Sequence, residues 1–180
     1  FFKKQNIPIV DCDEIAHDLM KPKNASWQAI KDNFGEEYLN DDQTINRKKL
    51  GQLVFSNKSA LNRLNQLTHP LIFDKTIQKI TSYQNEDMVI LDAPVYFESG
   101  LDKKHIANSV LVITLPESIQ IERLKQRNNL TDKEARMRIN SQMPLSKKTQ
   151  LADFVIENTG TIKELESKLE QLLNKIKKEG

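Results

Sequence analysis

Carboxylate side chains follow two short apolar runs of the sequence, at positions where strands would end. The run at residues 88–91 leads into Asp92, and the run at residues 7–10 leads into Asp11 and Asp13. Ligands of open α/β sheets bind just beyond the carboxyl ends of the strands. A carboxylate placed there can orient a hydroxyl group or accept its proton. The pattern predicts that these carboxylates orient or deprotonate a hydroxyl group of a ligand. The spacing of Asp13 by itself favours a simpler role as the N-cap of a helix.

Basic residues gather between positions 121 and 150, where eight lysines and arginines stand against three acidic residues. Arg123 and Arg127 are four residues apart and share one face of a helix, where two guanidinium groups can bind phosphate oxygens. An exposed helix face with ion pairs such as Glu134 with Arg138 explains the same residues without a ligand. The local excess of positive charge favours contact with a polyanion.

Asp92, Glu98 and His69 each allow a chemical and a structural interpretation. A carboxylate at the end of a buried strand holds the Mg²⁺ shell in P-loop enzymes, and Asp92, followed by Glu98, fits that pattern. A cap or a turn explains the same carboxylate without a metal. His69, directly before Pro70, can contact a phosphate or hydroxyl group, but a histidine at a helix corner is more commonly a hydrogen-bonded structural residue.

The composition is that of an ordinary soluble domain. The chain of 180 residues is long enough to bury a substantial core, and its net charge of +2 gives no general argument for nucleic acid or an anionic membrane as a partner. No apolar run approaches the length of a bilayer span, and no signal peptide is visible. The single cysteine, Cys12, cannot form an internal disulfide. We therefore expect a cytoplasmic protein.

Apolar runs and capping residues predict a parallel α/β fold. Strands are expected at residues 7–11, 88–91, 109–115 and 154–156, and the run at 88–91 suits a strand covered on both faces. Helices are expected between them, including one from a capping box at Thr131 through about Met143 and a closing helix from a capping box at Thr161. Strands separated by helices pair in parallel through crossover connections.

The long segment 24–84 contains helical patterns and no strand of its own. Trp27, Ile30 and Phe34 lie at helical spacing before Gly35, and further helices are expected over residues 47–55 and 59–67. Residues 68–70 are predicted to form a corner, with Pro70 at the first position of a new helix. We interpret this segment as a helical insertion that binds an acceptor.

Taken in order, these residues resemble the dephospho-CoA kinase family. The resemblance rests on residues 11–17, 45–47 before Leu50 and 54–55, 69–72, 92–94 with 97–98, Arg127, 138–139 with 142–144, Lys148 and 152–158, and it covers essentially the whole chain. Each motif alone is weak, but their order is specific. The resemblance implies a single kinase domain over residues 1–180, with a P-loop-kinase-like parallel sheet flanked by helices, an acceptor-binding insertion at 24–84 and a lid-like basic segment at 121–150.

One element of the family pattern is missing from the sequence. The phosphate-binding loop, of the form G-x-x-x-x-G-K-[ST], does not occur in it. Phe1 to Lys4 resembles the end of the helix that follows this loop in the family. We therefore expect the natural protein to begin upstream and to include a first strand, the loop and the start of that helix.

The resemblance also implies the reaction and its residues. The γ-phosphoryl group of ATP, bound with Mg²⁺, would pass to the ribose 3′-hydroxyl of dephospho-CoA in the last step of coenzyme A biosynthesis. Asp13, Arg127 and Arg138 would be catalytic, and Asp92 would lie near Mg²⁺ in its second shell. The acceptor would be bound by Asp11, Arg47, His69 and Glu98, and ATP by Arg127, Lys148 and Asn158.

Two other functions remain open at this point. A different kinase of the nucleoside-monophosphate type would share the fold and choose another acceptor. A non-catalytic nucleotide- or RNA-binding module would use the basic segment, although Asp11, Asp13 and Asp92 would repel phosphate unless Mg²⁺ intervened. The expected partners are ATP and dephospho-CoA, without nucleic acid or membrane, and the sequence leaves monomer and homo-oligomer undecided.

Overall fold

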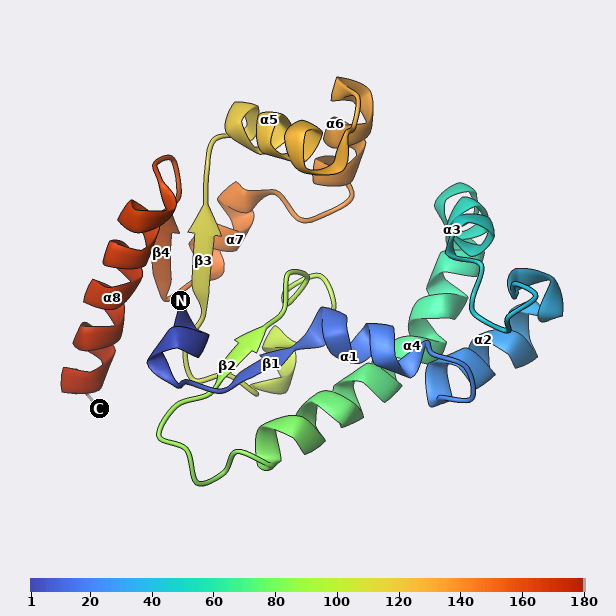
Figure 1. Ribbon diagram of the computed structural model, residues 1–180, viewed down its shortest axis with the longest axis horizontal. Helices are drawn as coiled ribbons and strands as arrows, with labels where there is room; N and C mark the ends of the chain where they lie inside the picture. The colour runs from blue at the N-terminus through green and yellow to red at the C-terminus, as the bar shows by residue number, and fades with distance from the viewer. Residues whose placement is uncertain (180) are drawn as a thin grey trace. The chain divides into compact units, whose positions relative to one another are not determined.

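The computed structural model describes residues 1–179 and divides into two compact units (Figure 1). The N-terminal unit spans Phe2–Ala93, and the C-terminal unit begins at Pro94. Each unit contains a two-stranded parallel sheet with helices around it. The predicted α/β class with parallel pairing is confirmed, and the strands form two separate pairs.

The sheet of the N-terminal unit joins the two strands that end in carboxylates. A 3₁₀ turn at Phe2–Gln5 precedes β1 (Ile9–Asp11), which pairs in parallel with β2 (Ile90–Asp92). Val10 is 1% exposed, whereas the residues of β2 are half-buried or exposed. The expectation that β2 is covered on both faces is therefore wrong, because Ile90 and Leu91 are only partly buried and Asp92 is exposed.

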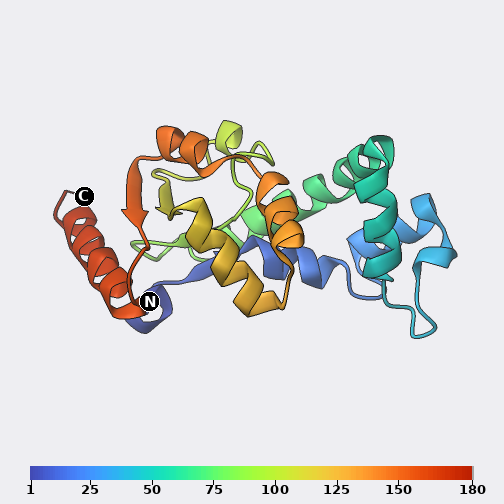
Figure 2. The ribbon, with the colours of Figure 1, turned by 90° about the horizontal axis from the view of Figure 1, so that it is seen from above.

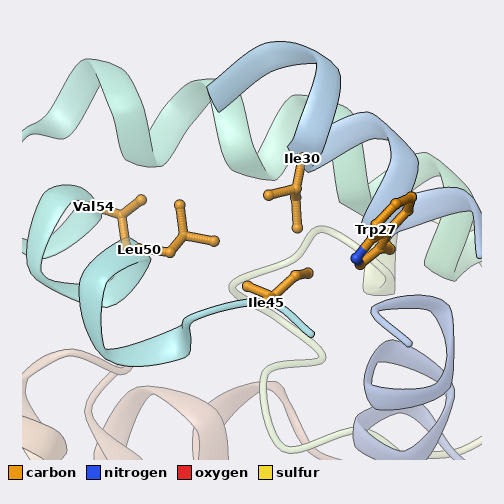
Figure 3. Close-up of a cluster of buried hydrophobic side chains, with 5 residues drawn as sticks. All are labelled: Trp27, Ile30, Ile45, Leu50 and Val54. Atoms are coloured by element: carbon orange, nitrogen blue, oxygen red, sulfur yellow. The ribbon is translucent and has the colours of Figure 1, made fainter. Parts of the chain in front are cut away.

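Helices of the N-terminal unit enclose a small apolar core. After α1 (Cys12–Leu19) come α2 (Ala25–Phe34), a 3₁₀ turn at Glu36–Tyr38 and α3 (Arg47–Ser56). Figure 3 shows the buried side chains of α2 facing those of α3 and of the segment before it. This core consists of Trp27, Ile30, Ile45, Leu50 and Val54.

One helix replaces the predicted corner at residues 68–70. The helix α4 runs from Lys58 to Thr81 with Pro70 inside it, so the expectation that Pro70 opens a new helix is wrong. A proline inside a helix removes one hydrogen bond and costs about 3 kcal/mol. The helix continues because α4 packs against α1, α2 and α3, and this tertiary burial outweighs the local cost.

The C-terminal unit begins with a loop and a 3₁₀ turn at Asp102–Lys104, followed by the second sheet. Its strands are β3 (Leu111–Thr114) and β4 (Phe154–Glu157), paired in parallel from Leu111 with Phe154 to Thr114 with Glu157. The closing helix α8 (Ile162–Glu179) lies along β4, as Figure 2 shows. Both strands and the closing helix lie where the sequence predicts them.

Three helices connect β3 to β4. They are α5 (Glu117–Asn128), α6 (Asp132–Asn140) and α7 (Leu145–Leu151). The capping box of Thr131 and Glu134 is confirmed. The expected end of α6 near Met143 is wrong, because α6 ends at Asn140 and α7 begins after Pro144, which disfavours helical backbone at the residue before it. No helix within residues 1–179 is long and apolar enough to cross a membrane.

Candidate active site

Two carboxylates stand side by side at the carboxyl end of the N-terminal sheet. Asp11 of β1 and Asp92 of β2 are direct partners in the strand register. The Asp11 side chain also accepts hydrogen bonds from the backbone N–H groups of Asp13 (2.9 Å) and Glu14 (3.0 Å). Asp11 is therefore the N-cap of α1, and the predicted cap role of Asp13 is wrong. Asp11 still has extended backbone, so its side chain can reach the first orphan N–H groups of the helix.

The capping by Asp11 leaves the Asp13 carboxylate exposed in the first turn of α1. Partial desolvation raises the pKa of Asp92 above its ordinary value, and the negative charges of Asp11 and Asp13 add to this effect. The charges of Asp11 and Asp13 are therefore close enough to Asp92 to affect its protonation. Excess negative charge of this kind is relieved by a cation or by a hydroxyl group that donates a hydrogen bond.

Cys12 lies between these carboxylates in sequence but faces the interior. Its Sγ lies 3.9 Å from the Thr76 hydroxyl of α4, and both residues are buried. Burial raises the pKa of the Cys12 thiol, as do the neighbouring carboxylates, while the Thr76 hydroxyl partly offsets the effect. The helix therefore turns its thiol inward and its Asp13 carboxylate outward.

Arg47 is the exposed first residue of α3, the helix that Asn46 caps through the Lys49 N–H (3.0 Å). Gly51 and Phe55 follow at intervals of four residues and share its face of the helix. Phe55 is 85% exposed, and its ring lies back over Gly51, 3.7 Å from where a Cβ atom would stand. The sequence placed Phe55 in the family pattern without giving it a role; its register matches Arg47 rather than the apolar stripe.

His69 lies near the middle of α4, and its side chain is exposed on the helix surface. Partial desolvation by the surrounding protein lowers the pKa of its imidazole below the ordinary value. The neutral ring is therefore favoured near pH 7. In this form it can donate or accept one hydrogen bond, but it supplies no positive charge to a phosphate.

In the C-terminal unit, Glu98 and Lys148 form an ion pair. The Lys148 Nζ lies 2.7 Å from Glu98 Oε1, and the two side chains are 8% and 22% exposed. Burial acts to raise the pKa of Glu98, but hydrogen bonds from Lys148 and from the Met143 amide outweigh it and leave the pKa below its ordinary value. The predicted acceptor ligand and the predicted ATP ligand are thus bound to each other.

Other cations of the basic segment are exposed, apart from the half-buried Lys125. Arg136 pairs with Asp132 (2.8 Å) and Glu117 (3.2 Å), whereas Arg127 on α5 and Arg138 on α6 form no ion pair within residues 1–179. The alternative pair of Glu134 with Arg138 does not form, because the Glu134 carboxylate is engaged with the Thr131 N–H and hydroxyl.

Two further candidate ligands lie in the middle of α5 and directly after β4. Arg123 donates to the Gly160 carbonyl at 3.3 Å, which does not fit the idea of Arg123 and Arg127 as a matched phosphate-binding pair. Asn158 directly follows β4, and its backbone N–H donates to the Thr114 carbonyl at 2.8 Å. It is therefore held at the carboxyl end of the second sheet.

Parallel strands with carboxylates at their carboxyl ends, flanked by helices and followed by a basic helical segment, define an α/β protein of the P-loop-kinase-like class. The sequence model of one family, described as dephospho-CoA kinase, matches residues 1–164. The chain belongs to the dephospho-CoA kinase family.

Curated relatives are similar over nearly the whole chain. A dephospho-CoA kinase of Lactobacillus acidophilus is 82% identical over 180 residues, which are 100% of this chain and 90% of that protein. A dephospho-CoA kinase of Lactobacillus johnsonii is 49% identical over 178 residues, which are 98% of this chain and 89% of that protein.

Solved structures show the same fold. A crystal structure of a Thermus thermophilus protein matches with a TM-score of 0.82 and 26% identity, covering 97% of this chain and 87% of the other. A dephospho-CoA kinase from Campylobacter jejuni matches with a TM-score of 0.71 and 28% identity, covering 98% and 88%.

Proposed function

We propose that this protein transfers the γ-phosphoryl group of ATP to the ribose 3′-hydroxyl of dephospho-CoA. Membership of the dephospho-CoA kinase family across residues 1–164 is the observation that carries the proposal. Phosphoryl transfer requires alignment of the two substrates and neutralisation of charge more than covalent chemistry by the protein. The side chains described above supply groups for both tasks.

Asp13 is the proposed catalytic carboxylate. Its side chain is exposed in the first turn of α1, and the cap made by Asp11 fixes the backbone of that turn. From this position Asp13 would orient the 3′-hydroxyl or accept its proton. General-base catalysis typically contributes roughly 10²- to 10⁴-fold, and the lower end suits a loose transition state.

Magnesium is proposed to accompany ATP beside Asp92. Within residues 1–179 no group of three or more histidine, cysteine or acidic side chains is placed to hold a metal directly. The shared negative charge of Asp92, Asp11 and Asp13 nevertheless suits Mg²⁺, which keeps several waters and takes few protein ligands. Mg²⁺ would supply neutralisation of the phosphate charge, and Asp92 would hold it through water.

The acceptor is proposed to bind on the helices of segment 24–84. Arg47 would pair with its phosphate groups, and neutral His69 would hydrogen-bond a hydroxyl or phosphate oxygen. Phe55, on the same face of α3 as Arg47, offers a flat apolar surface to an adenine ring. Asp11 keeps one carboxylate oxygen, Oδ2, for the acceptor, since the bonds of its cap go to Oδ1.

Arg127 and Arg138 are proposed to bind the phosphates of ATP. Both are exposed and carry charge that no carboxylate of residues 1–179 neutralises within an ion pair. Bidentate guanidinium contacts suit phosphate oxygens, and closure of segment 121–150 as a lid would exclude water from the transfer. Asn158 is proposed to lie near the adenine of ATP.

A cytoplasmic location of the protein stays a prediction from the sequence.

The test is release of ADP from Mg-ATP, with dephospho-CoA, AMP and CMP compared as acceptors. The protein is prepared at its full natural length. We expect ADP release that depends on dephospho-CoA and is weak with AMP or CMP. Release that depends instead on AMP or CMP would assign the other kinase class, and salt-sensitive RNA binding without any transfer would favour the binding module.

A further inference from the structure

Lys148 differs from every other lysine of the basic segment 121–150 in being buried. Lys148 is 6% exposed, whereas its neighbour Lys147 is exposed. The Lys148 ammonium group donates to the Pro94 carbonyl at 2.8 Å and to Glu98 Oε1 at 2.7 Å. A buried ammonium group is tolerated when it is paired and hydrogen-bonded in this way. Little of its surface remains for a phosphate group.

Glu98 Oε1 serves two donors at once. Besides the Lys148 ammonium group, it accepts the backbone N–H of Met143 at 2.8 Å. Met143 lies in the link between α6 and α7, directly before Pro144, and Lys148 lies inside α7. One carboxylate therefore ties the loop that begins at Pro94 both to α7, through Lys148, and to the link before it, through Met143.

The contacts of Glu98 with Lys148 and with the Met143 N–H, called the clasp below, lie at one end of the basic segment. Arg138 is in the last turn of α6, five residues before Met143, and α6 has a single buried residue, Ala135. The link from Met143 onward is fastened by Glu98, whereas α6 itself is mostly exposed. α6 is also held by α5, through packing of the two helices and the ion pair of Arg136 with Glu117, so the link after α6 is one of two attachments that place Arg138.

We infer that Glu98 and Lys148 are positioning residues that anchor the C-terminal end of the basic segment, and so fix the place of Arg138. They would act through Arg138. The sequence had predicted instead that Glu98 contacts the acceptor and that Lys148 contacts ATP. The part of the inference that concerns catalysis rests on the proposed kinase function. The anchoring itself rests on the contacts of Pro94, Glu98, Met143 and Lys148 alone.

The test compares Lys148→Met, Lys148→Arg and Glu98→Gln with the control Lys147→Met, whose side chain is exposed. Small displacements of a catalytic group can cost up to ~10²-fold in rate, so Lys148→Met should lower kcat at least ~10-fold while KM for ATP changes less than ~3-fold. Lys148→Arg should recover part of kcat, because it keeps the charge. Lys147→Met should match the unaltered protein.

A second readout does not depend on activity. In the protein without ligands, Lys148→Met and Glu98→Gln should speed trypsin cleavage after Arg136 and Arg138, because local opening exposes the segment to the protease. Lys147→Met should leave the cleavage rate unchanged. If Lys148→Met does not fold, Glu98→Gln supplies the comparison, since its amide oxygen still accepts the Met143 N–H.

Two results would overturn the inference. A rise in KM for ATP of ~10-fold or more with unchanged kcat and unchanged cleavage would make Lys148 a direct ATP ligand. Cleavage and kcat that both match the control would show that the clasp positions nothing. If the unaltered protein transfers no phosphate, the kinase proposal fails while the cleavage measurement still decides the anchoring.

Discussion

Asp11 makes the first turn of α1 possible, and that turn carries Asp13. Its side chain accepts two N–H groups that the helix itself leaves without partners. Asp11→Ala should lower the free energy of unfolding by about 1 kcal/mol, the usual cost of losing an N-cap. Asp11→Asn should retain most of that stability, because asparagine caps helices equally well. Urea unfolding of both variants measures the difference; equal losses would show that charge, and not capping, is the contribution of Asp11.

The Phe55 side chain is 85% exposed. A large apolar ring on the surface is a sensitive probe of acceptor binding. Stacking of a base on an aromatic ring is worth roughly 1–3 kcal/mol, so Phe55→Ala should raise KM for dephospho-CoA about tenfold and leave KM for ATP unchanged. The control is Ile162→Ala, which removes a side chain that is 76% exposed at the start of α8. Equal KM values for Phe55→Ala and the unaltered protein would remove Phe55 from the acceptor site.

At the scale of elements, the core between α2 and α3 fixes the position of α3, the helix that carries Arg47 and Phe55. Ile30 is 0% exposed and faces Leu50 and Val54 of α3 (Figure 3). Ile30→Ala should cost about 2–5 kcal/mol of unfolding free energy, and Ile30→Val about 0.5–1.5 kcal/mol. Calorimetry or urea unfolding checks this order; a smaller loss for Ile30→Ala than for Ile30→Val would contradict the packing described.

The clasp of Glu98 and Lys148 should also appear in the dependence of stability on pH. The pKa of Glu98 is lowered in the folded protein, so its stabilising contribution is present above the pKa of the unfolded chain and is lost as the pH falls through the folded pKa. The stability advantage of the unaltered protein over Glu98→Gln should therefore be largest near neutral pH and shrink in acid. Unfolding curves across pH 2–7 measure it, and a constant difference would exclude a charged Glu98 as its source.

Local sequence signals predicted most elements because each has a local cause. The runs before Asp11 and Asp92, and the capping boxes at Thr131 and Thr161, act within a few residues and are found where expected. The interruption expected at Pro70 failed because packing of α4 on three other helices outweighs a local penalty. The ion pair of Lys148 with Glu98 could not be predicted, because Glu98 lies 50 residues earlier and no local pattern links the two residues.

For the whole molecule, the two units hold different parts of the proposed chemistry. The N-terminal unit carries the carboxylates and the helices with Arg47 and His69, and the C-terminal unit carries Arg127, Arg138 and Asn158. The family model matches residues 1–164, which include parts of both units, and this supports the proposal that these residues serve one reaction. The order of motifs could suggest a set of candidate residues, but the cap role of Asp11 required the backbone geometry of β1 and α1.

The most direct test of the account is a comparison of Asp13→Asn with the unaltered protein, each prepared as the full-length natural protein. The substitution keeps the size of the side chain and removes its ability to accept a proton. We expect turnover of dephospho-CoA to fall by roughly 10²- to 10⁴-fold, while the Kd for Mg-ATP changes less than about threefold. Equal losses of turnover and of ATP binding would contradict the role of Asp13 in orienting the acceptor hydroxyl.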